Sequence, residues 1–205
     1  MKQRLGACAV WAALYALGGC VSLPPIVDDG LEFAERRARL EALPGWEMRG
    51  RLAVDTGERA YQGRFRWRKD ADTLMLSVRG PLGTGSFEVS GSPSELTVRA
   101  KGETWVLDDP EIELSQRIGW WLPVGSLGAW LIGVPDRKFE SQSEQGPPGV
   151  LASLEQRLWR LDYDSYQLAE GMLVPRNIDM SHGAIELRLT VDAFSSVPSP
   201  RDALN

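Results

Sequence analysis

Apolar and polar residues alternate with a period of two along most of this chain after residue 45. Residues 46–54 (WEMRGRLAV) and 61–69 (YQGRFRWRK) show the pattern most clearly, and in the second segment Phe65 and Trp67 share one face while three arginines share the other. Strict alternation is typical of antiparallel strands that bury one face. A long sheet of such strands must curl around something that covers its apolar side, as a barrel or as an open half-barrel with a helical cover.

The same alternation predicts seven further strands. They lie at residues 74–78, 86–90, 96–100, 104–107, 157–163, 173–178 and 184–194. Glycine, proline, serine or Lys-Gly turns separate the strands before residue 108, which are therefore expected to form consecutive hairpins. The segment 140–149 (ESQSEQGPPG) is polar throughout and is expected to be mobile.

About three helices are available to cover the sheet. Residues 31–43 are good helix formers, and either Asp28 or Asp29 is available as the N-cap. A short, very apolar helix is predicted at residues 127–132, after a break at Pro123.

The remaining helix is predicted to begin near residue 110. Asp109 is a suitable N-cap, with Pro110 at the first helical position. A competing register uses Asp108 and Glu111 as a capping box.

The predicted fold class is mainly β with α, a single incomplete antiparallel β-barrel covered by a few α-helices. Its apolar side is either filled by its own side chains or hollow enough to bind an apolar ligand. Composition does not decide between these alternatives, because large aromatic side chains fill a core or line a pocket equally well. Seven tryptophans follow the first nineteen residues: Trp46, Trp67, Trp105, Trp120, Trp121, Trp130 and Trp159.

The first twenty residues have the features of a secretory signal. Lys2 and Arg4 precede an uncharged apolar stretch at 5–17, which is too short to span a bilayer. The ending, LGGC at residues 17–20, resembles the lipobox of bacterial lipoproteins, in which Cys20 becomes the lipidated first residue, carrying S-diacylglycerol and an N-acyl group. The alternative is an ordinary signal peptide followed by an incidental cysteine.

Cleavage at this point predicts four segments: a lipoprotein signal peptide at 1–19, a lipidated tether at 20–30, one domain at 31–194 and a disordered tail at 195–205. It removes two basic residues and no acidic one, so the net charge changes from −5 to −7. That balance argues against nucleic-acid binding, and against adsorption to an anionic membrane through charge alone. No cysteine is left for a disulfide, a nucleophile or a metal site.

Few residues suit catalysis. The single histidine, His182, lies between two predicted strands, where a hairpin role is favoured over that of a base or ligand. Metalloprotease, nucleophile-elbow, phosphate-loop and paired-carboxylate motifs are absent from the sequence. We therefore expect neither an enzyme nor a cofactor or metal requirement.

Several motifs, taken in order, resemble those of the outer-membrane lipoprotein receptor LolB family, the last component of the bacterial lipoprotein-sorting pathway. They are the lipobox at Cys20, the Tyr61/Phe65/Trp67 strand, the Pro81–Gly83 loop, the strand around Trp159, the final alternating strand, and residues 119–135 with Gly119, Pro123, Leu127, Trp130, Gly133 and Pro135 in the family's register. Two departures are Phe194, where a tryptophan is expected, and a longer C-terminal tail.

The resemblance implies a helix-covered half-barrel with an apolar cavity for the acyl chains of other lipoproteins. Such a protein takes its cargo from the soluble periplasmic carrier LolA and delivers it into the inner leaflet of the outer membrane, with its own domain facing the periplasm. Val21, which follows Cys20, is not the aspartate associated with inner-membrane retention. The implied partners are LolA, cargo lipoproteins and outer-membrane lipid, and the chain is expected to be a monomer.

The resemblance also assigns functional residues. The family's functional leucine, at the tip of a protruding loop, corresponds to Leu82, so Pro81–Gly83 is expected to be a membrane-insertion loop. Phe65, Trp67 and Trp130 are candidates for the acyl-chain cavity from the face and the cover they occupy, and core packing accounts for them equally well. The alternative hypothesis is a structural or scaffolding outer-membrane lipoprotein with a solid core and no cargo cavity.

Overall fold

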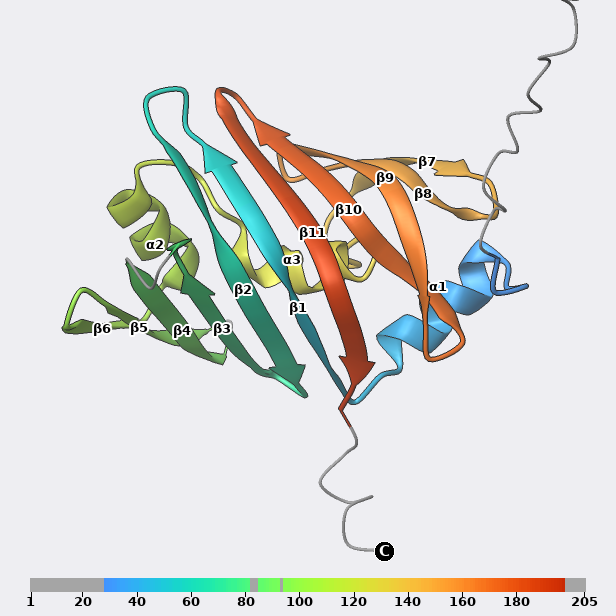
Figure 1. Ribbon diagram of the computed structural model, residues 1–205, viewed down its shortest axis with the longest axis horizontal. Coiled ribbons are helices and arrows are strands. Elements are labelled where there is room, and N and C mark those ends of the chain that lie inside the picture. The colour runs from blue at the N-terminus through green and yellow to red at the C-terminus, as the bar shows by residue number, and fades with distance from the viewer. Residues whose placement is uncertain (1–27, 82–84, 93, 198–205) are drawn as a thin grey trace, which may run out of the picture.

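The sheet is a single open antiparallel layer with three helices against one face (Figure 1). The computed structural model describes residues 28–81, 85–92 and 94–197. Its eleven strands follow the order β6-β5-β4-β3-β2-β1-β11-β10-β9-β8-β7, so two series of hairpins meet where β1 pairs with β11. Because β6 and β7 remain at opposite edges of the sheet, the barrel is incomplete. The predicted fold class is confirmed in its sheet and its helical cover.

The nine predicted strands are all present, with ends shifted by a few residues, and two more are found. The strands are β1 (Gly45–Asp55), β2 (Ala60–Asp70), β3 (Thr73–Arg79), β4 (Ser86–Ser92), β5 (Glu95–Ala100), β6 (Glu103–Leu107), β7 (Ser141–Gly146), β8 (Val150–Gln156), β9 (Trp159–Ala169), β10 (Met172–His182) and β11 (Ile185–Ser196). The helices are α1 (Phe33–Glu41), α2 (Pro110–Ile118) and α3 (Val124–Leu131).

The prediction of a mobile polar segment at 140–149 is wrong. This stretch contains β7, whose backbone pairs with β8 along its whole length, with Ser143 opposite Leu154. Nearly every β7 side chain is exposed, so the strand is held by backbone hydrogen bonds and carries no apolar pattern. β8 escaped prediction for the opposite reason, since it buries consecutive as well as alternate residues.

Two helix starts also differ from prediction. α1 begins after Glu32, which makes no side-chain capping bond, so neither Asp28 nor Asp29 is its N-cap. α3 begins at Val124, three residues before the expected start, directly after Pro123. A proline at the N-cap needs no N–H donor, because the first amides of a helix have no intrahelical partner.

The start of α2 is confirmed at Asp109, whose carboxylate accepts a hydrogen bond from the Ile112 amide. The competing register through Asp108 and Glu111 is not used. Instead the Glu113 carboxylate accepts from the amides of Asp108 and Asp109.

Asp29 ties the segment before α1 to the sheet. Its carboxylate accepts hydrogen bonds from Arg36 on α1 and, at 2.7 Å, from the Leu173 amide on β10. Arg36 also donates to the carbonyl oxygens of Leu31 and Gly149. Both side chains of the ion pair are almost fully buried. Residues 28–30, assigned to the tether by sequence, are therefore part of the folded domain.

The other end of the domain also extends past its predicted boundary at residue 194. Ser196 still pairs with Trp46 on β1, and the Val197 amide donates to the Gly45 carbonyl at 2.9 Å. The ladder continues because β1 begins at Gly45 and offers these positions partners. The rest of the predicted tail, from residue 198, lies outside the described residues.

Gly50 sits where β1 is flanked by β2 and β11. A Cβ atom added to it would lie 2.0 Å from the Thr190 carbonyl oxygen and 2.9 Å from the Phe65 ring. The Thr190 carbonyl of β11 leaves no room for a side chain, so this position of β1 requires a glycine.

Candidate functional site

The candidate site is the interior between the sheet and its helical cover. Side chains from β1–β3, β8–β11, α1 and α3 form one apolar cluster there. A smaller cluster joins β3–β6 to the start of α3. The helices lie behind the sheet in the view of Figure 1, on the side of the main cluster. This interior is the part of the described chain with the chemistry to hold an apolar molecule.

The structure brings together the three residues predicted to line a cavity. Phe65 and Trp67 on β2 and Trp130 on α3 all belong to the main cluster, with exposed fractions of 4%, 6% and 0%. Trp46 and Phe194 stack beside them, so phenylalanine fills the expected tryptophan position with an aromatic ring. In this conformation the three residues pack as core, and any ligand must displace part of that packing.

Trp130 is held by polar contacts as well as by packing. Its indole N–H donates to the Gln156 side-chain oxygen at 2.7 Å, and its carbonyl accepts from the Tyr163 hydroxyl at 2.9 Å. The Gln156 amide nitrogen donates to the carbonyls of Asp136 and Phe139. Sequence reasoning missed Gln156 and Tyr163, because neither shows any local motif.

Burial shapes the ionisation of Tyr163. Its hydroxyl is enclosed in the apolar cluster, and this desolvation raises its pKa well above the ordinary value. The hydroxyl therefore stays protonated and keeps donating to the α3 backbone over the whole physiological pH range.

Two indole N–H groups in this region lack a hydrogen-bond acceptor among the described residues. They belong to Trp67 and Trp159, both of which are nearly inaccessible to solvent. A buried donor without a partner costs free energy that an acceptor of suitable position would recover.

Arg157 fastens the cover to the sheet, in an arrangement that we call the Arg157 clamp. From the β8–β9 turn, its guanidinium donates two hydrogen bonds to the Glu111 carboxylate on α2, at 2.8 and 2.7 Å. It also donates to the Ser126 hydroxyl on α3. The Phe139 ring lies 4.1 Å and the Trp121 ring 5.4 Å from the guanidinium carbon. One side chain thus joins α2 and α3 to the β8–β9 hairpin of the sheet.

The clamp is a charge-assisted pair in a partly buried setting. Burial raises the pKa of Glu111, but hydrogen bonds from Arg157 and from the Gly125 amide outweigh it, so the pKa lies below its ordinary value. Arg157 has a φ of 54°, a left-handed conformation that is uncommon outside glycine and that the tight β8–β9 turn imposes. No local pattern predicts this contact, because its partners are far apart along the chain.

The predicted membrane loop joins β3 to β4. The Gly80 amide donates to the Gly85 carbonyl at 2.9 Å and closes the loop at its base, directly after the paired residues Arg79 and Ser86. Pro81 is described, whereas Leu82 and Gly83 lie outside the described residues, as does the lipidation site Cys20. Their predicted roles stay predictions.

A surface groove of about 500 Å³ lies beside the far edge of the sheet and was not predicted. Six of its nine lining residues have a charged or amide side chain. It is lined by Glu140, Ser141, Gln142, Glu155, Gln156, Arg157, Leu158, Trp159 and Arg160.

His182 has a structural environment at the end of β10. Its ring stacks on Trp159 at 5.4 Å, and its Nδ1 lies 2.9 Å from the Leu158 carbonyl oxygen. Within residues 28–81, 85–92 and 94–197, no three histidine, cysteine or carboxylate side chains group in a way that could hold a metal ion. Over the same residues, none of the helices is long and apolar enough to cross a membrane.

Comparison with known proteins gives a consistent result. A family model described as outer membrane lipoprotein LolB matches residues 44–194. The outer-membrane lipoprotein LolB of Nitrosococcus oceani is 34% identical over 185 residues, which cover 88% of this chain and 92% of that protein. That of Alkalilimnicola ehrlichii is 31% identical over 191 residues, 91% of this chain and 94% of that protein. A LolA superfamily protein from Nitrosomonas europaea shares the fold, with a TM-score of 0.51, 8% identity and coverage of 85% and 98% of the two chains.

Proposed function

Because this chain belongs to the outer membrane lipoprotein LolB family, we propose that it accepts lipoproteins from the carrier LolA and inserts them into the outer membrane. Family membership makes it an outer-membrane lipoprotein of the sorting pathway and not an enzyme. During transfer from LolA to this chain, the acyl chains of the cargo lie between the sheet and its helical cover. One observation carries this proposal: helices cover the sheet's apolar face, and local polar contacts, the Arg157 clamp among them, fasten these helices to the sheet.

The energetics of acyl chains favour such direct transfer. Burying one methylene contributes about 0.8 kcal/mol, so three chains of roughly fifteen methylenes represent on the order of 35 kcal/mol. Release of the cargo into water is therefore not a workable step. The cargo must pass from one apolar site to the next, driven by the difference between them, and no nucleotide is needed.

Separating the cover from the sheet costs little free energy from exposed apolar surface if acyl chains cover the side chains that lose contact. Trp130 and its neighbours on α3 leave the β2 face, and methylenes cover the surfaces that they expose. The Trp67 N–H, which lacks an acceptor among the described residues, then meets the ester carbonyl groups of the incoming chains. The contacts that must break without replacement are a few hydrogen bonds, namely those of the Arg157 clamp and those that hold Trp130.

A transfer assay tests the proposal. The chain from residue 20, with Cys20→Ser, keeps every residue of both apolar clusters and is mixed with LolA that carries a lipoprotein. We expect the lipoprotein to leave LolA and to co-purify with the chain. Cargo that stays on LolA, together with no saturable binding of a fluorescent fatty acid, would identify a solid core and support the scaffolding alternative.

Arg157→Ala is expected to loosen the cover. Losing hydrogen bonds to a partly buried carboxylate lowers the free energy of unfolding by about 1–3 kcal/mol, and we expect the rate of fatty-acid uptake to rise. Urea denaturation and stopped-flow fluorescence measure the two effects. Arg117→Ala is the matched control. Arg117 pairs with Glu113 on the solvent side of α2, the helix that also carries Glu111. Reduced stability with an unchanged uptake rate would show that the clamp does not gate the interior.

A further inference from the structure

Three arginines stand in a row across the outer face of the sheet. Arg51 on β1 is directly opposite Arg64 on β2, and Arg64 is directly opposite Arg79 on β3. All three side chains are exposed, and they point away from the cover because their neighbours Phe65 and Val78 are buried on the inner face. We call these three residues the arginine row.

The row is not neutralised by the fold. Arg51 makes one exposed ion pair with Asp192, at 3.1 Å, on the neighbouring strand β11. Within the described part of the chain, neither Arg64 nor Arg79 pairs with a carboxylate. Like charges directly opposite one another on paired strands destabilise a sheet. A row of three therefore works against folding and calls for another explanation.

Neighbouring arginines on the same face are treated differently. Arg49 and Arg66, also directly opposite each other, share the buried Glu47 carboxylate at 2.8 and 2.7 Å. Arg68 pairs with Asp70 at the end of β2. The fold thus pairs these three arginines and Arg51 with carboxylates, and among the described residues it leaves Arg64 and Arg79 without one.

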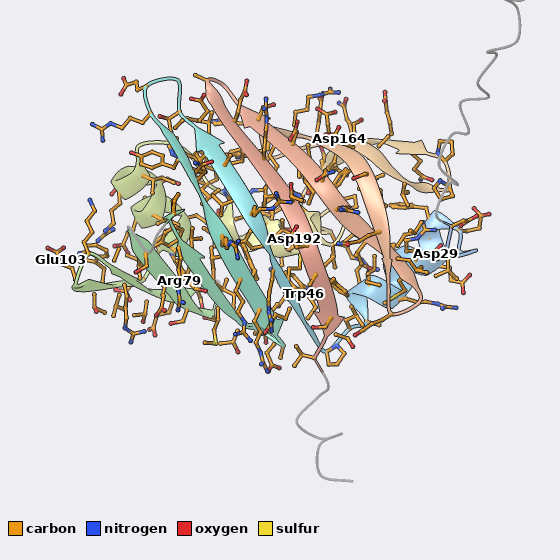
Figure 2. The ribbon with its side chains drawn as sticks, viewed as in Figure 1. Asp29, Trp46, Arg79, Glu103, Asp164 and Asp192 are labelled. Carbon is orange, nitrogen blue, oxygen red and sulfur yellow. The ribbon has the colours of Figure 1, made fainter. Side chains whose placement is uncertain are left out.

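The opposite half of the outer face is acidic. Figure 2 shows Arg79 on one side of the sheet and Asp164 on the other, with Asp192 between them. The exposed carboxylates of β9–β11 outnumber the three exposed arginines of the same strands, Arg160, Arg176 and Arg188. These carboxylates are Asp162, Asp164, Asp179, Glu186 and Asp192. Although the net charge of the chain is negative, its outer face has a basic pole, on β1–β3, and an acidic pole, on β9–β11. Apart from the contact between Arg51 and Asp192, dissolved salt screens the interaction between exposed charges that lie more than about 10 Å apart.

The row ends at the loop that is proposed to enter the membrane. Arg79 is the last residue of β3, and the chain passes from it into Gly80 and Pro81. We propose that Arg51, Arg64 and Arg79 dock the domain on the phosphates of anionic phospholipid headgroups, so that the basic pole faces the bilayer while the loop enters it. Guanidinium groups match phosphate in a bidentate geometry, and juxtamembrane basic residues attract anionic lipid surfaces. This inference rests on the proposed function, since it orients the domain for delivery.

Vesicle binding tests the arginine row. The chain from residue 20 with Cys20→Ser is floated with phosphatidylcholine vesicles that contain or lack phosphatidylglycerol. We expect binding that requires phosphatidylglycerol and weakens with salt. Replacing Arg51, Arg64 and Arg79 together with glutamine should lower this affinity about a hundredfold, at about fivefold for each arginine. The variant should remain folded, with no loss in melting temperature, because the substitutions relieve like-charge contacts.

The matched control replaces three exposed arginines elsewhere, Arg39, Arg160 and Arg188, with glutamine and so changes the charge equally. It should keep most of the vesicle affinity. Equal losses in both variants, or an unchanged affinity of the row variant, overturn the proposal. So does a row variant that binds vesicles normally but accepts less cargo from LolA, because the row then faces the carrier.

The vesicle assay contains neither carrier nor cargo, so the two proposals fail separately. If even the unsubstituted chain takes no cargo from LolA while vesicle binding still depends on the row, the transfer function fails and the membrane-docking surface stands.

Discussion

Leu82→Glu is expected to leave the chain folded and able to take up cargo, while delivery into membranes falls by about thirtyfold or more. A leucine that enters the bilayer surface contributes about 2 kcal/mol, which corresponds to that factor, and a carboxylate in its place adds a desolvation cost. Folding should not change, because the hydrogen bond between Gly80 and Gly85 that closes the base of the loop joins backbone atoms and does not involve the substituted side chain. Transfer of a labelled lipoprotein from the loaded chain to vesicles measures delivery.

Leu158→Glu is the matched control. Leu158 is an exposed leucine, with 84% of its surface accessible, in the turn of the β8–β9 hairpin, which carries the Arg157 clamp. We expect this variant to deliver cargo normally. Normal delivery by Leu82→Glu, or an equal defect in both variants, would return the β3–β4 connection to the role of a simple turn.

Arg36→Ala should be the most destabilising of the single charge removals considered. It leaves the Asp29 carboxylate buried without its partner, and breaking a buried ion pair in this way costs about 3–5 kcal/mol. Arg39→Ala is the control on the same helix, because Arg39 forms a solvent-exposed ion pair with Glu35. An exposed pair contributes about 0–1 kcal/mol to the free energy of unfolding. Equilibrium urea denaturation distinguishes the two values. Similar midpoints for both variants would contradict a structural role for the buried pair.

The same ion pair predicts a loss of stability in acid. Burial raises the pKa of Asp29, but hydrogen bonds from Arg36 and from the amides of Leu173 and Leu31 prevail and lower it from 3.8 to about 2. A carboxyl whose pKa falls on folding stabilises the native state above its unfolded pKa. This stabilisation, on the order of 2 kcal/mol, is lost as the pH drops from about 4 to about 2. Arg36→Ala should remove much of that pH dependence, which acid titration of the unfolding free energy measures.

The strands that could be predicted were those with one face exposed to solvent and the other face buried. β1, β2 and β11 alternate because the sheet's inner face is covered and its outer face is not. β7 has solvent on both sides, and β8 buries adjacent residues near the cover, so neither leaves a period-two record in its sequence. Edges and crowded regions of a sheet are set by backbone pairing and by packing from other elements.

The candidate site divides in the same way. Phe65, Trp67 and Trp130 were identified because strand alternation and helix position assign them to the inner side, and the structure gathers them in one cluster. The contact between Glu111 and Arg157 was invisible, because it joins helix α2 to a turn after β8. Polar contacts across such a separation depend on where the helices dock, which no local pattern encodes.

The sequence by itself determined the one-sided strands, the small number of cover helices and the resemblance to the LolB family, and it predicts an export signal. These properties are local, since each depends on residue types at short fixed spacings. Only the tertiary structure decided which charges meet. Net composition argued against electrostatic attraction to an anionic membrane, yet strand register aligns Arg51, Arg64 and Arg79 and gathers the carboxylates of β9–β11 elsewhere. Strand pairing brings distant segments to a spacing of about 4.8 Å. Because salt screens charges that are far apart, the charges that lie close together determine the local electrostatic attraction more than the net charge of the chain does.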